Sequence, residues 1–179
     1  EKELERAYEL GADAAAQRAL HYRIQLALGN FEEVSVSLAQ EGGADGLTAA
    51  EAATFRGNAE LGLGRSAEAE ASFRAALAED PGYADAKIGL TGALQAQGRS
   101  EEAAAVVADL IETHPEQPAG WLMRGQMAIR DGRLEAARDD FRQAVDAARA
   151  KPDRTREFIA LTGLAESQIG LSELDGAEQ

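Results

Sequence analysis

The feature that most constrains this chain is an internal repeat. Segments that begin at Ala50, Ala84 and Pro118 align with one another, and their starts lie 34 residues apart. An earlier start at Ala15 and a later one at Phe158 extend the series. A period of about 20–50 residues indicates supersecondary units that stack on their neighbours. We therefore expect residues 1–179 to form one array with units that begin near residues 15, 50, 84, 118 and 158.

Each unit has the pattern of two helices. Residues 84–97 carry apolar side chains at helical spacing, Gly98 is a residue that favours a helix C-terminus, and Ser100 is a good N-cap for the next helix. Aromatic residues make up only 5% of the chain, which argues against strands. The sequence therefore predicts an all-α fold. The same turn pattern recurs at Gly29-Asn30, Gly64-Arg65-Ser66 and Gly132-Arg133.

The repeat resembles the tetratricopeptide repeat (TPR) family, whose pattern is W-x2-L-G-x2-Y, then A-x3-F, then P. The fourth unit supplies Trp121, Gly125, Ala137 and Phe141 at these positions. The resemblance implies a right-handed α-solenoid of about four full helix-turn-helix units with half-units at both ends. Matching residues in the second and third units are Gly57, Ala69, Phe73 and Pro81, then Leu90, Ala103, Val107 and Pro115.

Small residues in the paired helices predict close packing within each unit. Larger residues such as Phe73 and Phe141 are expected to fill the space between neighbouring pairs. The small residues of the first helices are Gly57, Thr91, Gly125 and Ala165, and their expected counterparts are Ala69, Ala103, Ala137 and Ala177.

The two ends of the chain depart from this regularity. The first unit has Tyr22 and Val34 where small residues are expected, which indicates a degenerate repeat or a bend. Leu4–Leu10 resembles the second helix of a missing unit, and another second helix is expected after Leu161–Ile169. We therefore expect a fragment of a longer array, whose uncapped ends could self-associate.

The net charge of −14 limits the possible partners. Such a surface repels a phosphate backbone, so nucleic acid is not an expected ligand. The sequence contains no cysteine, which excludes disulfides and thiolate metal sites. No apolar run approaches the ~20 residues that span a bilayer, so we expect no direct membrane insertion.

The TPR resemblance implies a concave groove lined by positions two, five, nine and twelve of the first helices. These positions would form an apolar floor with a few amides and one charge of each sign, which suits a peptide or helix of a protein partner. The Lys, Asn and Arg of a carboxylate-clamp groove are not reproduced, so chaperone tails are not expected ligands. The predicted groove residues are Arg23, Leu26, Asn58, Leu61, Ile88, Gln95, Leu122, Gln126, Ile129 and Glu166.

No catalytic, cofactor-binding or metal-binding constellation is visible in the sequence. His21 and His114 are the only histidines, and neither has neighbouring ligand types in the sequence. Phosphate-binding and nucleophile motifs are absent. We therefore expect a protein–protein interaction scaffold and not an enzyme. Two alternatives stay open: a substrate-holding segment of a larger enzyme, such as a glycosyltransferase, and a self-assembly module.

The amino-acid sequence of the repeats is similar to that of the repeats in TPR lipoproteins of bacterial exopolysaccharide-export and protein-sorting loci. Segments that carry this similarity are Leu26–Glu33 and Leu122–Gln126. The chain also has 15 Arg against 3 Lys, a bias typical of GC-rich bacterial genomes. The similarity implies a bacterial envelope or secretion assembly, periplasmic or tethered to the outer membrane in preference to cytoplasmic.

Overall fold

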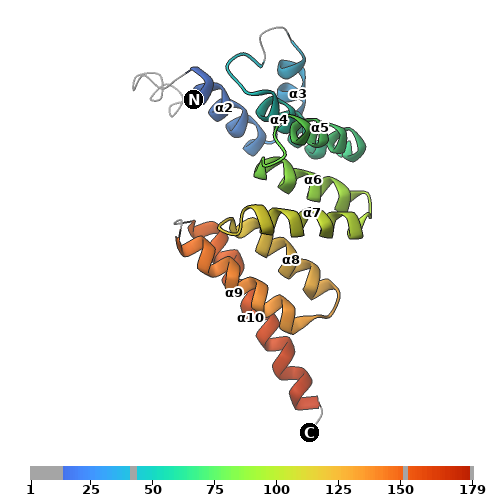
Figure 1. Cartoon of the computed structure of the whole chain (residues 1–179), viewed down its shortest axis with the longest axis vertical. Coiled ribbons are helices and arrows are strands. Elements are labelled where there is room, and N and C mark those ends of the chain that lie inside the picture. Colours follow the sequence, from blue (N-terminus) through green and yellow to red (C-terminus); the bar gives the residue numbers. More distant parts are fainter. Residues whose placement is uncertain (1–13, 41–43, 151–152, 178–179) are drawn as a thin grey trace. The chain divides into compact units, whose positions relative to one another are not determined.

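The computed structural model describes residues 14–40, 44–150 and 153–177, and these ranges form nine helices with no strand (Figure 1). The predicted all-α fold of paired helices is confirmed. The chain divides into two compact units, Glu1–Ser100 and Glu101–Gln179.

The first unit consists of helices that pack mainly on their neighbours in the chain. Helix α4 contacts α2, α3, α5 and α6, and α5 contacts α6. A capping box begins α4, because Thr48 accepts a hydrogen bond from the Glu51 N–H while Glu51 accepts one from the Thr48 N–H. The helices are α2 (Ala14–Ala27), α3 (Phe31–Ala39), α4 (Ala49–Gly62), α5 (Ser66–Glu79) and α6 (Ala84–Ala96).

The second unit holds the candidate site. Its helices are α7 (Ser100–Thr113), whose first residue still belongs to the first unit, α8 (Pro118–Arg130), α9 (Leu134–Ala150) and α10 (Arg154–Ala177). Helix α9 packs against both α8 and α10, and α10 also contacts α8 directly. Two first helices of successive repeats, α8 and α10, therefore lie next to each other.

Glycine turns end the first helices of the repeats. Gly98 has a φ of 73°, and the N–H of Arg99 reaches back to the carbonyl oxygen of Leu94 at 2.9 Å, as in a Schellman motif. An L-residue with a side chain adopts this backbone conformation at a cost, so glycine is favoured. The same geometry occurs at Gly29, Gly64 and Gly132.

The fifth repeat has no such turn, and the predicted second helix after Ile169 is wrong. Ser172 occupies the position of the turn glycine, and its hydroxyl donates to the Ile169 carbonyl at 2.8 Å within the helix. Helix α10 consequently runs without a break to Ala177. Ala165 and Ala177 lie on the same helix, so they cannot form the predicted pair between two helices.

Two phenylalanine rings fill the gaps between helix pairs, as the sequence predicted. Phe73 lies against Gly57 of α4 and Gly89 of α6, and Phe141 lies against Gly125 of α8 and Gly163 of α10. A Cβ added at Gly163 would lie 2.5 Å from the Phe141 ring. The absence of side chains at these glycines is therefore what lets each ring enter the gap.

The first repeat accommodates its large residues by polar and aromatic contacts. Tyr22 is buried, its ring centroid lies 5.6 Å from that of Phe55, and its hydroxyl lies 2.9 Å from the Ser37 hydroxyl. Val34 is buried in the same cluster. The predicted half-unit at Leu4–Leu10 lies outside the described residues.

Candidate functional site

Six of the ten predicted groove residues lie in the first unit. Arg23 is exposed, and the others are half-buried. Burial raises the pKa of the nearby Tyr83 hydroxyl, the charges of Asp85 and Glu51 raise it further, and the charge of Arg23 opposes them. The six residues are Arg23 and Leu26 on α2, Asn58 and Leu61 on α4, and Ile88 and Gln95 on α6.

The other four lie in the second unit, and one of them is a core residue. Leu122 is only 7% exposed and belongs to a cluster with Phe141 of α9 and Ala160 of α10. Ile129 packs partly buried against the same cluster. Leu122 is therefore corrected from a ligand-facing residue to a packing residue, because α10 covers its position on α8.

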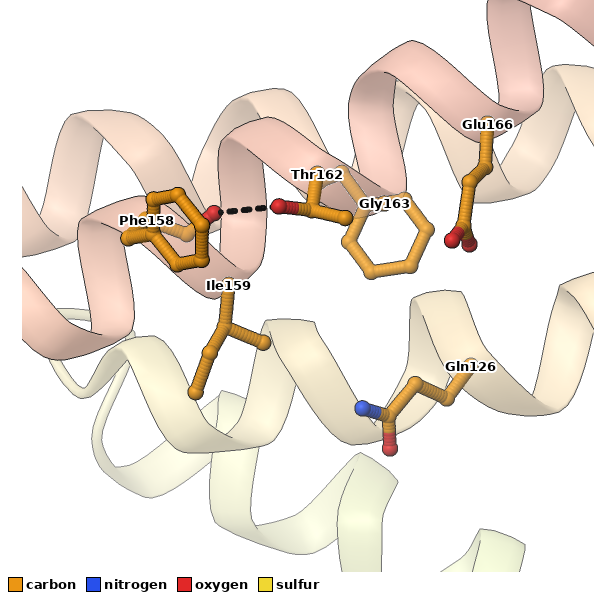
Figure 2. Close-up of a pocket in the computed structure, with 7 residues that line it drawn as sticks. Gln126, Phe158, Ile159, Thr162, Gly163 and Glu166 are labelled. Atoms are coloured by element: carbon orange, nitrogen blue, oxygen red, sulfur yellow. Dashed lines mark hydrogen bonds between the residues drawn. The ribbon is translucent and has the colours of Figure 1, made fainter.

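Gln126 and Glu166 are brought together at a pocket of about 260 Å³. Figure 2 shows Glu166 and Ile159 extending from α10 toward α8, which carries Gln126. Pockets for drug-sized ligands measure about 300–1,000 Å³, so this one suits one or two side chains. Its lining residues are Gln126, Phe141, Phe158, Ile159, Thr162, Gly163 and Glu166.

Local hydrogen bonds fix the first turns of α10, which carry part of the pocket lining. Asp153 precedes α10 and accepts a hydrogen bond from the Arg156 N–H at 2.9 Å, which is the interaction of an N-cap. This hydrogen bond, with the Arg156 side chain, lowers the pKa of Asp153. About two turns into the helix, Thr162 donates its hydroxyl to the Phe158 carbonyl at 3.0 Å (Figure 2). The Thr162 hydroxyl is thus already satisfied within α10.

The absence of a side chain at Gly163 brings the buried Phe141 ring to the edge of the pocket. The Phe141 ring comes within 2.5 Å of the place where a Cβ of residue 163 would be, and Phe141 is one of the lining residues. Phe141 is otherwise buried in the core of the unit. One apolar side chain of the pocket lining, Phe141, therefore belongs to the core of the unit.

Exposed apolar side chains are concentrated on α10. Of the six exposed large hydrophobic residues in the described part of the chain, four lie on this helix: Phe158 at 72%, Ile159 at 40%, Leu161 at 41% and Ile169 at 58%. Single exposed apolar residues are ordinary, but a group on one helix indicates a surface for contact. Phe158 and Ile159 belong to the pocket, whereas Leu161 does not line it.

Sequence reasoning did not select Phe158, Ile159, Thr162 or Gly163 as site residues. The repeat register contains the signal for two of them, because Ile159 and Thr162 are the second and fifth positions of the unit that begins at Phe158. Gly163 lacks such a signal, since its role depends on the phenylalanine of the preceding repeat.

Neither a cluster of metal-ligand side chains nor a helix able to span a membrane occurs among residues 14–40, 44–150 and 153–177. Within them, no three His, Cys, Asp or Glu side chains are grouped so as to hold a metal ion. Over the same residues, no helix combines the length and the apolar character needed to cross a bilayer.

Comparison with known proteins places the repeats in a family. Three sequence models, each described as "Tetratricopeptide repeat", match residues 60–127, 25–84 and 118–151. The chain is also 30% identical over 138 residues to the bovine (Bos taurus) protein "DnaJ homolog subfamily C member 3", an alignment that covers 76% of this chain and 27% of that protein. The chain thus spans about a quarter of the length of this relative. TPR repeats generally mediate protein–protein interaction and are typically found in scaffolds without enzymatic activity. The chain belongs to the tetratricopeptide-repeat family.

Proposed function

We propose that the chain is a scaffold that binds a peptide or helix of a partner protein on the surface formed by α8 and α10. The observation that carries this proposal is the pocket in which the exposed Ile159 and Phe158 adjoin the Phe141 ring. Burial of such apolar surface is the main favourable term in most protein association. The size of the pocket favours a protruding side chain over a cofactor.

Of the predicted groove residues, Gln126 and Glu166 are the best-supported ligand contacts. Ile159 and Thr162, which line the same pocket, are added to them. Gln126, Ile159, Thr162 and Glu166 are exposed, so a ligand can reach them without unfolding the unit. Asn58, Leu61 and the other predicted residues of the first unit remain candidates for a second contact surface. Arg23 is exposed and the other five are half-buried, so part of each side chain is accessible.

A selection from a random peptide library tests the proposal. Phage-displayed peptides are selected on the purified chain, and the bound site is mapped by amide chemical-shift changes. We expect the largest changes at Gln126, Ile159, Thr162 and Glu166. Changes confined to the outer surface of α9, for example around Asp146, would contradict the proposed site.

A second candidate function is self-assembly, which the exposed Leu161 favours. Leu161 and Ala165 lie four residues apart on α10, so they share a face, and both are exposed. This face lies outside the pocket lining. Sedimentation across a range of concentrations, with Leu161→Ser as the comparison, separates the two functions. Self-assembly predicts association that Leu161→Ser abolishes.

The setting in a bacterial envelope or secretion assembly is the finer part of the proposal. It is supported by the similarity of the repeats to TPR lipoproteins and by the bias toward Arg over Lys. Fractionation of the source cells, followed by immunodetection, tests it. Recovery in the envelope or periplasmic fraction is expected, and recovery in the cytoplasmic fraction alone would contradict it.

A further inference from the structure

We infer that the α8–α10 pocket selects a peptide segment in which a lysine or arginine adjoins an apolar residue. This inference rests on the proposed function and adds the chemistry of the partner. The pocket combines an apolar wall, formed by Phe141, Phe158 and Ile159, with the carboxylate of Glu166. A ligand that fills the pocket must satisfy both parts.

Glu166 has no partner within the part of the chain that the structure describes. No hydrogen bond or ion pair joins it to a described residue, and its side chain is exposed. Neighbouring acidic groups differ in this respect. Asp140 is paired with Arg124 at 2.6 Å, Glu157 with Arg149 at 2.7 Å and Asp153 with Arg156 at 2.7 Å.

These pairs leave Glu166 available to an external cation. The guanidinium groups of Arg124, Arg149 and Arg156 are each held by another carboxylate. Gln126, on the facing helix, likewise makes no hydrogen bond to a described residue and can donate to or accept from a peptide backbone. The pocket therefore presents one uncompensated negative charge and one amide beside an apolar wall.

Other classes of occupant fit less well. An anionic ligand would meet Glu166 in a chain whose net charge is already −14. A wholly apolar segment would remove the carboxylate from water without a partner, which is costly. Glu166 does not belong to any grouping of three metal-ligand side chains among the described residues. A lysine or arginine beside an apolar residue satisfies both the carboxylate and the wall.

Three sets of synthetic fluorescent peptides test the inference by anisotropy. They share leucine-containing cores and differ only in the flanking residue, which is lysine, glutamine or glutamate. The intact chain should bind the lysine set about two- to fivefold more tightly than the glutamine set, the range expected for a partly exposed ion pair. The glutamate set should bind most weakly.

A charge reversal at the pocket and a matched reversal elsewhere separate local recognition from general attraction. Glu166→Lys should invert the ranking, so that the glutamate set binds most tightly. Asp146→Lys makes the same change in net charge on the exposed surface of α9, outside the pocket, and should preserve the original ranking. Circular dichroism verifies that both variants fold.

Each outcome decides between the inference and the proposed function. If Glu166→Lys leaves the ranking unchanged while Ile159→Ser weakens all three sets, the inference fails and the proposed function stands. If both reversals alter the ranking equally, the selectivity is a property of the whole acidic chain, and the inference also fails. If neither Glu166→Lys nor Ile159→Ser affects binding, both fail. Absence of binding by every set overturns the inference.

Discussion

At the scale of single residues, one glycine that packs against a phenylalanine ring belongs both to the core and to the candidate site. Gly163 is buried against Phe141, and the same ring contributes to the pocket wall. Ala165, two residues later on α10, is exposed. A larger side chain should therefore destabilise the protein at Gly163 but have little effect on its stability at Ala165.

Replacing Gly163 by leucine should destabilise the protein by about 1–3 kcal/mol, because the new side chain overpacks the Phe141 site. Ala165→Leu adds the same side chain to the exposed face and should change stability by less than about 0.5 kcal/mol. Urea unfolding of both variants is the measurement. Equal stability of the two would contradict the packing described for Phe141.

Glu70 is a second residue whose environment gives a defined prediction. Its carboxylate accepts a hydrogen bond from Gln97 at 2.9 Å and one from Arg99 at 2.6 Å, and it pairs with Arg74 at 2.7 Å. The Gln97 hydrogen bond is the largest cause that lowers the pKa of Glu70, and the two arginines lower it further, whereas burial opposes them. Because the pKa is lower in the folded state, this stabilisation is present above the unfolded pKa near 4.5 and is lost as the pH falls through the folded value.

Glu70→Gln should therefore lower the free energy of unfolding by about 1.5–3 kcal/mol at pH 7, as expected for hydrogen bonds to a charged group. Below pH 4.5 the difference between wild type and variant should narrow progressively. Denaturant unfolding from pH 7 to pH 2 follows this difference. A difference that stays constant across the whole range would show that the charge of Glu70 does not contribute.

At the scale of helices, the turn glycines determine where each first helix ends. Gly98 has a positive φ, and apart from its own residue and its chain neighbours no atom lies within 4 Å of the place where its Cβ would be. The cost of a substitution there comes from the backbone alone. In the fifth repeat, where Ser172 replaces the glycine, the helix continues.

Gly98→Ala should cost about 1–2 kcal/mol, the penalty of the left-handed conformation for a residue with a Cβ. Asparagine tolerates this conformation better, so Gly98→Asn should cost less than Gly98→Ala. Thermal unfolding of the two variants tests the order. A smaller loss for alanine than for asparagine would contradict the assigned turn.

The sequence was sufficient to predict the paired helices of the regular repeats, but it predicted neither the unbroken α10 nor all the contacts between helices. The repeat spacing and the glycine turns are local signals, and α6 and α8 begin at Ala84 and Pro118, the aligned starts. The burial of Leu122 depends on α10 packing over α8, which its position in the repeat does not reveal. The Glu70 contacts join residues 27 and 29 positions apart. The arginine recurs in other repeats as Arg65 and Arg133, but the next two repeats have Ala104 and Arg138 at the position of Glu70.

At the scale of the whole molecule, the chain consists of two compact units with separate hydrophobic clusters. One cluster includes Tyr22, Val34 and Phe55, and the other includes Leu122, Phe141 and Ala160. Repeat proteins derive stability from each repeat and its neighbours, so a surface can be changed in one unit with little effect on distant ones. The exposed positions of α10 are therefore suitable places to test function without unfolding the protein.

The burial of Leu122 also determines which substitutions are informative. Aspartate at this position would place a charge in the core and should unfold the second unit, so loss of binding would have no clear meaning. Ile159 and Leu161 are better suited, because they lie on the same helix and have nearly equal exposure, 40% and 41%. Of these two residues, Ile159 lines the pocket and Leu161 does not.

The most direct measurement is the affinity of one library-selected peptide for wild type, Ile159→Ser and Leu161→Ser, determined by calorimetric titration. Ile159→Ser should weaken binding by about tenfold or more, because a buried isoleucine contributes about 1.5–3 kcal/mol and each 1.4 kcal/mol is tenfold. Leu161→Ser should bind within about twofold of wild type, since Leu161 lies outside the pocket and surface substitutions away from a site usually have small effects. Unchanged binding by Ile159→Ser, or a larger loss for Leu161→Ser, would contradict the proposal that the α8–α10 pocket is the binding site.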